Sequence, residues 1–167
     1  MQQLAFTYKN YPLRWFHLLI GIIGVIVFLN TGQYMDKELN HLRGMELGPR
    51  ALYRSAHIYI LFASLMHLLL GAYLQQATGI IRNMLQYAAS LMIVIALGLF
   101  IYSFYTETNL QLIERPNIRL GIYLSAASTI THVIVALAQP TLDTKPEEAK
   151  NLHSSGIKKS SASITEG

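Results

Sequence analysis

Residues 50–75 read RALYRSAHIYILFASLMHLLLGAYLQ, and this stretch decides how the rest of the chain is interpreted. Two arginines, Arg50 and Arg54, stand one helical turn apart at its start. A long apolar run that contains His57 and His67 follows. No Asp, Glu, Lys or Arg occurs between residues 55 and 81. Because roughly 20 apolar residues let a helix cross the hydrocarbon core of a bilayer, we predict a transmembrane helix over 51–75.

Three further runs without charged residues cover 15–35, 83–106 and 120–142. They predict helices over 13–31, 84–105 and 117–138. Only 13% of the chain is charged, whereas soluble domains average about 25%. A soluble helical bundle would carry charges at helical spacing on its outer faces, and none of the four runs has any. We therefore predict an all-α protein, an integral membrane four-helix bundle.

The remaining segments are short or polar. A signal peptide is the competing interpretation of the first run, but Leu29–Gly32 is a poor cleavage site and the run suits a full span. The loop over 32–53 has partial amphipathic character. Gly48-Pro49 is expected to end this segment before the next helix begins. Residues 1–140 thus form the predicted transmembrane domain. Residues 141–167 are rich in Lys, Glu, Ser and Thr and predict a disordered tail.

An even number of spans places both termini on one side of the membrane. Seven basic residues on the terminal side against six on the other leave the orientation undecided. We expect cytoplasmic termini, because a short disordered tail is more often left untranslocated, and a bacterial inner membrane as the location. The net charge of +4 is spread over loops and tail and does not indicate nucleic-acid binding. The expected partners are the lipid bilayer and other membrane subunits.

Residues 115–139, RPNIRLGIYLSAASTITHVIVALAQ, echo the opening stretch. An offset of 65 aligns two arginines and one histidine of the two segments, and an offset of 64 aligns six other residues. The slip of one residue leaves open whether the echo is a duplication or a coincidence. A duplication would imply two parallel repeats about an axis along the membrane normal.

Both echoing helices gather their polar residues in one narrow stripe. At about 100° per residue, each stripe is less than about 90° wide. Because lipid disfavours polar groups, we expect both stripes to face the bundle interior and each other. His67 and His132 each follow an arginine by 13 residues, which places them at similar depth, about 20 Å beyond it. The predicted polar seam comprises His57, Ser64, Gln75, Ser125, Ser128 and Gln139.

The histidines are the residues of the spans that titrate near neutral pH. The spans contain no carboxylate and the chain has no cysteine, so paired-carboxylate hydrolysis, thiolate chemistry and carboxylate-based ion transport are not indicated. No catalytic residue is identified. The favoured function is a non-enzymatic accessory or interaction subunit, in which His67 and His132 make hydrogen bonds across the bundle.

Two other functions remain open. A b-type haem needs two imidazoles at matching depth, and His67 and His132 are the candidate axial ligands. A polar metal site would add His17 as a third nitrogen ligand. A small transporter or channel would use the polar seam. Four arginines lie near the membrane surface that is farther from His67 and His132, and we expect them to bind anionic lipid or another anionic ligand. They are too distant to contact the propionates of a haem at the depth of these histidines. They are Arg50, Arg54, Arg115 and Arg119.

Overall fold

The computed structural model describes residues 12–108 and 114–138, and these residues form four long helices without a strand. All four are long and apolar enough to cross a membrane. The predicted all-α transmembrane four-helix bundle is therefore confirmed. The predicted tail lies outside the described residues. The elements are α1 (Pro12–Lys37), the short 3₁₀ helix η1 (Asn40–Leu42), α2 (Leu47–Tyr73), α3 (Ile80–Thr106) and α4 (Pro116–Leu137).

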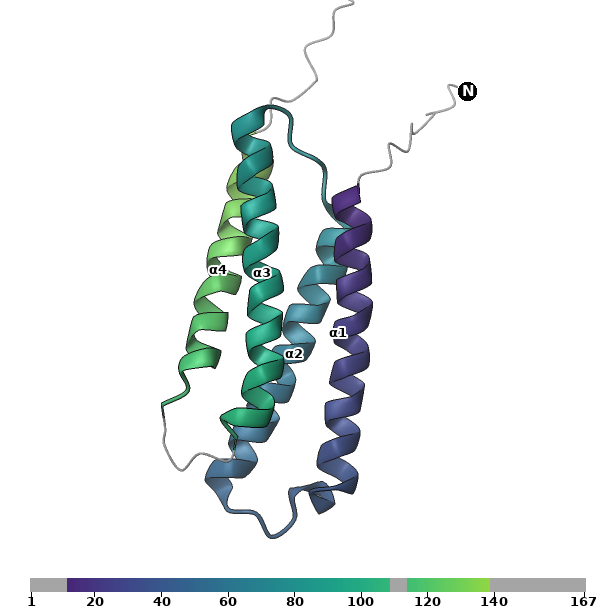
Figure 1. Cartoon of the computed structure of the whole chain (residues 1–167), viewed down its shortest axis with the longest axis vertical. Coiled ribbons are helices and arrows are strands. Elements are labelled where there is room, and N and C mark those ends of the chain that lie inside the picture. The colour runs from purple at the N-terminus through teal and green to yellow at the C-terminus, as the bar shows by residue number, and fades with distance from the viewer. Residues whose placement is uncertain (1–11, 109–113, 139–167) are drawn as a thin grey trace, which may run out of the picture. The chain divides into compact units, whose positions relative to one another are not determined.

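The bundle consists of two helical hairpins. Helix α1 packs along α2, and α3 packs along α4, as Figure 1 shows. The two hairpins meet mainly where α2 packs against α3. Short connections favour antiparallel neighbours, which explains why each helix packs most extensively against a helix that adjoins it in sequence. The parallel helices α2 and α4 are consequently not packed against each other along their length.

The region between α1 and α2 differs from the prediction. Helix α2 begins at Leu47, so Pro49 lies in the first turn of the helix and not in the loop that precedes it. Proline is tolerated there because the first N–H groups of a helix have no acceptor within the helix. Helix α1 continues to Lys37. Within the loop of partial amphipathic character, the helical part is the single turn η1, where His41 has a left-handed backbone with φ of 56°.

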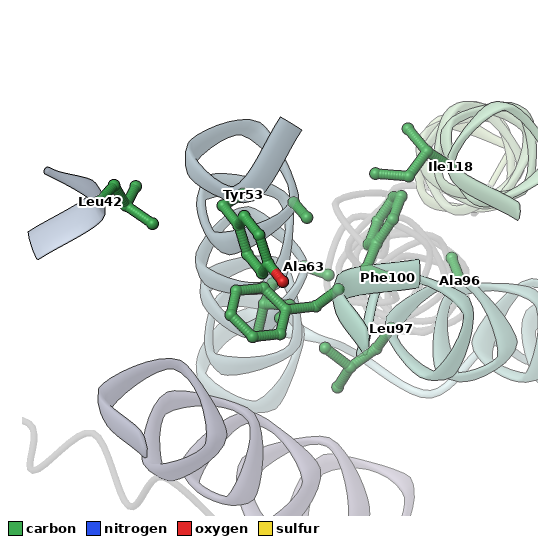
Figure 2. Packing of buried hydrophobic residues seen from close by; sticks show 10 residues of the cluster. Leu42, Tyr53, Ala63, Ala96, Leu97, Phe100 and Ile118 are labelled. Atoms are coloured by element: carbon green, nitrogen blue, oxygen red, sulfur yellow. The ribbon is translucent and has the colours of Figure 1, made fainter. Parts of the chain in front are cut away.

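An apolar core lies where α2, α3 and the start of α4 meet (Figure 2). Tyr53 packs edge-on against Phe104 with ring centroids 5.4 Å apart, and Tyr59 stacks on Phe100 at 5.3 Å. Ile118 of α4 is also buried in this cluster. The outer faces of the helices carry exposed Leu, Ile, Val, Phe and Tyr side chains, which is the pattern expected of helices surrounded by lipid.

Small residues allow α1 and α2 to approach closely. A methyl group at Gly21 would lie 2.9 Å from the backbone nitrogen of Leu68, and one at Gly71 would lie 2.8 Å from that of Leu18. Both positions would therefore bring a side chain against backbone, which cannot move aside easily. Close approach through small residues is a common way for membrane helices to associate, and it fixes the α1–α2 hairpin.

Candidate functional site

Three buried histidines from three helices meet inside the bundle. His17 lies on α1, His67 on α2 and His132 on α4, and Ser90 of α3 completes what we call the histidine cluster. The Nδ1 atoms of His17 and His67 are 2.8 Å apart, and Nε2 of His17 is 2.9 Å from the Ser90 hydroxyl oxygen. Each of the four helices thus contributes one polar side chain to the cluster.

His17 contacts both of the other imidazoles. Its ring centroid is 5.0 Å from that of His67 and 6.2 Å from that of His132. In the described part of the chain, no direct ring contact joins His67 to His132. The sequence predicts a similar depth for His67 and His132, but it does not predict that His17 is the central member of the cluster.

The proton positions in the cluster follow from counting donors. The single proton of the Ser90 hydroxyl is donated to the carbonyl oxygen of Gln86, so this hydroxyl accepts the Nε2–H of His17. The Nδ1 atom of His17 is then an acceptor, and the Nδ1–H of His67 donates to it. Because a neutral imidazole has one N–H, Nε2 of His67 has a free lone pair. This is the form of histidine that binds a metal.

Three ring nitrogens of the cluster have no hydrogen-bond partner among the described residues. They are Nε2 of His67 and both nitrogens of His132. The backbone of Ile93 lies close to the His67 imidazole. No hydrogen bond of ordinary geometry joins it to Nε2. A buried polar atom without a partner costs roughly 1–3 kcal/mol. These three nitrogens are therefore available to a partner from outside the chain, either a water molecule or a ligand.

The predicted polar seam is divided between the hairpins. The α2 residues face α1: His57 donates through Nδ1 to the Thr31 hydroxyl of α1 at 2.9 Å, and Ser64 donates to the Ile60 carbonyl and lies against Gly24. On α4, Ser128 donates to the Ala89 carbonyl of α3 at 2.7 Å. The two stripes face the interior but not each other, because α2 and α4 each pack against their hairpin partner.

The other seam positions play smaller parts. Ser125 is buried, and its hydroxyl has no partner within the described residues. Gln75 is exposed, and its backbone carbonyl accepts a hydrogen bond from the Gln86 side chain at 2.7 Å. Gln139 lies outside the described residues.

The predicted arginines lie at one end of the bundle, which we call the arginine surface. Arg115, just before α4, donates to the Ser55 hydroxyl of α2 at 2.7 Å and to the Leu52 carbonyl at 3.4 Å. These bonds join the starts of the two parallel helices. Arg50 donates to the Met45 carbonyl at 3.0 Å, whereas Arg54 and Arg119 are exposed.

Sequence reasoning missed a buried carboxylate. Glu107 directly follows α3 and is only 2% exposed. It accepts hydrogen bonds from the backbone N–H groups of Asn117 at 2.7 Å and Ile118 at 3.4 Å, and from the Ser103 hydroxyl. Glu107 follows the span, as the sequence predicts for the acids, but its burial and its hydrogen bonds were not predicted. Burial lowers the pKa of the nearby Arg115 guanidinium, and the Glu107 carboxylate opposes that shift.

Arg14 is a second residue whose role was not predicted. Its guanidinium donates to the carbonyls of Gly71 at 3.1 Å and Ala72 at 2.8 Å. The last carbonyls of a helix have no partner within it, so Arg14 of α1 caps the end of α2. An arginine at the start of a span gives little signal of this contact, because the sequence does not show which helix end lies beside it.

The cluster is not arranged as a metal site with three protein ligands. Among the described residues, no group of three or more His, Cys, Asp or Glu side chains is placed to hold a metal ion. Both nitrogens of His17 are already engaged, with His67 and Ser90. A polar metal site that uses His17 as a third ligand is therefore not favoured by this geometry.

Comparison of the chain with protein-family models, curated protein sequences and solved structures found no match. The function is therefore inferred from the buried side chains. Because a fold does not determine an activity, the four-helix architecture adds the membrane environment and the placement of the cluster, and the chemistry follows from the imidazoles.

Proposed function

We propose that this integral membrane protein binds a b-type haem, which His67 and His132 would hold. The observation that carries the proposal is the set of three buried ring nitrogens without partners, Nε2 of His67 and both nitrogens of His132. Two buried imidazoles, one from each hairpin, are the ligand type that a bis-histidine haem requires.

The hydrogen bonds of His67 support a ligand role. A histidine that binds a metal through one ring nitrogen usually donates its other N–H to a fixed acceptor. The Nδ1–H of His67 donates to His17 at 2.8 Å, and His17 is held in turn by Ser90. This chain of bonds orients the free lone pair of His67, so His17 acts as a positioning residue and not as a third ligand.

The arrangement of the hairpins also supports the proposal. His67 belongs to the α1–α2 hairpin and His132 to the α3–α4 hairpin. The hairpins meet mainly through α2 and α3, and α1 and α4 share little of the interface. A flat macrocycle inserted between hairpins disturbs less packing than one inserted within a hairpin, where the glycines of α1 and α2 leave no room.

A bound haem would supply one-electron redox chemistry in the membrane, and the chain's own residues would bind and orient it and exclude water. Such a protein exchanges electrons with other membrane components, which agrees with the expected membrane subunits as partners. A purely structural accessory subunit explains the bonds of His17 to His67 and Ser90, but it gives no role to the two unpaired nitrogens of His132.

The test is a reduced-minus-oxidised visible spectrum of the protein purified in mild detergent from haem-replete cells. We expect a b-type signal that is lost in His67→Ala and in His132→Ala. His57→Ala is the matched control, because His57 bonds Thr31 and lies outside the cluster, and it should keep the signal. A flat wild-type spectrum at full protein yield would contradict the proposal and favour the accessory subunit.

His17→Asn tests the positioning role separately. Loss of an outer-shell partner typically weakens metal binding by about 10–100-fold, so we expect weaker haem retention and a shifted midpoint potential, with a low-spin spectrum preserved. Potentiometric titration of wild type and variant measures both effects. Unchanged affinity and potential would show that His17 does not act on the haem through His67.

We further propose that the protein lies in a bacterial inner membrane with both termini in the cytoplasm. The absence of cysteine from the sequence makes the orientation easy to test. A single cysteine introduced at Ser155 should be shielded from an impermeant thiol reagent in intact cells, and one introduced at Arg43 should react. The reverse pattern would show that the termini face the other side.

A further inference from the structure

A groove of about 560 Å³ lies between α2 and α4, on the side of the bundle away from α1. Ile58 and Phe62 line it from α2, Ile122 and Ala126 line it from α4, and Phe100 of α3 forms its floor. Its walls are almost wholly apolar. The groove exists because α2 and α4 are parallel helices that do not pack against each other, so the space between them is left to another molecule.

Two exposed arginines flank the end of this groove at the arginine surface. Arg54 precedes Ile58 by four residues on α2, and Arg119 precedes Ile122 by three residues on α4. Residues three or four apart lie on the same helical face, so each arginine continues one wall of the groove. Within the described parts of the chain, no carboxylate forms an ion pair with either guanidinium. Two guanidinium groups without a counter-ion among the described residues thus stand where the groove meets the membrane surface.

The hydroxyl of Ser125 provides an independent polar feature inside the groove. Ser125 lines the groove, is 5% exposed, and its oxygen has no partner within the described residues. Thr129, one turn further along α4, donates its hydroxyl proton to the backbone carbonyl of Ser125, as hydroxyl side chains in helices commonly do. The side-chain hydroxyl of Ser125 makes no such bond. Ser125 lies six residues beyond Arg119, which is about 9 Å deeper along the helix.

We propose that the groove binds one anionic phospholipid, with its phosphate between Arg54 and Arg119. The polar and apolar groups follow the order found in such a lipid. The guanidiniums meet the phosphate at the surface, the Ser125 hydroxyl donates to an ester carbonyl below it, and the apolar walls contact an acyl chain. Arginine is suited to the phosphate because its planar fork matches phosphate oxygens.

Charge distinguishes this occupant from another helix. A second copy of this chain would have to place acidic groups opposite Arg54 and Arg119. Within the four described helices the one carboxylate is that of Asp36, which already pairs with His41. An anionic lipid brings its charge at the correct depth and is abundant at the membrane surface. The proposal is independent of the haem site, because the histidine cluster does not line the groove.

Native mass spectrometry of the detergent-purified protein, titrated with phosphatidylglycerol or phosphatidylcholine, tests the proposal. We expect one tightly bound phosphatidylglycerol per chain and weaker binding of phosphatidylcholine. The double variant Arg54→Gln/Arg119→Gln should lose about thirtyfold in phosphatidylglycerol affinity, since each basic residue near an anionic surface contributes roughly fivefold. Arg54→Lys/Arg119→Lys should retain most of the preference.

The matched control, Lys37→Gln/Arg43→Gln, removes the same charge from the same end of the bundle and should bind as wild type. Ala126→Phe should fill the groove and weaken both lipids. Thermal unfolding of each variant confirms that it is folded. Equal loss in the control pair would show only a diffuse surface charge effect and would overturn the site. So would unchanged lipid binding by Ala126→Phe, or a dimer in wild type that Ala126→Phe disrupts.

Discussion

Helix α2 has two faces that meet their surroundings in opposite ways. Toward α1 it presents Gly71 and Ser64, and the two backbones approach so closely that added methyl groups would collide. Toward α4 it presents Ile58 and Phe62, and a groove of about 560 Å³ remains. The difference shows that residue size, more than hydrophobicity, decides which helices of this bundle touch, as expected where lipid competes for apolar surface.

Helix α4 follows the same rule with a different partner. Its Gly121 lies against the Phe100 ring of α3, and Ser128 bonds the Ala89 carbonyl of that helix. The small and polar residues that α2 and α4 share are therefore used for packing within each hairpin. The resemblance of the two helices in sequence does not make them partners, and this leaves the groove between them.

The largest effect is expected where the tight face is broken. Gly71→Ala and Gly21→Ala each force a methyl group to within 3 Å of backbone in the opposite helix. We expect each to lower the free energy of unfolding by about 3 kcal/mol, the upper part of the range for overpacking. Thermal or denaturant unfolding in detergent, followed by circular dichroism, measures the loss.

Gly98→Ala is the control for this prediction. An added methyl group there meets no atom within 4 Å, so stability should stay the same or rise slightly, because alanine favours the helix. Equal losses at Gly98 and Gly71 would contradict the claim that close approach, and not a general property of helical glycines, fixes the α1–α2 hairpin.

A smaller loss is expected at the connection that anchors α4. Glu107→Ala removes the acceptor of two N–H groups at the start of α4 and of the Ser103 hydroxyl. Leaving buried donors unpaired costs roughly 1–3 kcal/mol, and we expect about 2 kcal/mol in the same unfolding experiment. Glu114→Ala, an exposed carboxylate nearby, should leave stability unchanged. Equal effects of the two substitutions would contradict the capping role.

The smallest effect sharpens the contrast between packed and open faces of α4. Ser128→Ala removes a hydrogen bond to α3 and should cost about 0.6 kcal/mol, the average for interhelical bonds in membranes. Ser125→Ala removes a buried hydroxyl that has no partner among the described residues, so the stability of the lipid-free protein should stay the same or rise. The free energy of unfolding of each variant is compared with that of the wild-type protein. A larger decrease for Ser125→Ala than for Ser128→Ala would indicate a protein partner for the Ser125 hydroxyl.

The sequence was sufficient for the helices because uncharged runs of 21 to 27 residues leave few alternatives in a chain of this length. It also placed His67 and His132 at similar depth, since helical rise is constant. It did not identify the neighbours of each helix. That choice depends on small differences in packing between similar apolar faces, which an amphipathic pattern does not record.

The polar caps were missed for a related reason. Arg14 and Glu107 each bond backbone groups of a helix distant in sequence or across a connection. A backbone N–H or carbonyl carries no residue identity, so no pattern in the sequence marks it as a partner. His17 was missed as the centre of the cluster because its role depends on the tight α1–α2 contact, which brings it to within hydrogen-bonding distance of His67.

Electron paramagnetic resonance of the oxidised protein, purified from haem-replete cells, tests the central claim most directly. Two imidazole ligands make ferric haem low-spin, so the haem site formed by His67 and His132 predicts a low-spin ferric signal with about one haem per chain. Loss of either ligand should convert the signal to high-spin or abolish it. The absence of any haem signal at full protein yield, or a high-spin signal in the wild-type protein, would contradict the bis-histidine site.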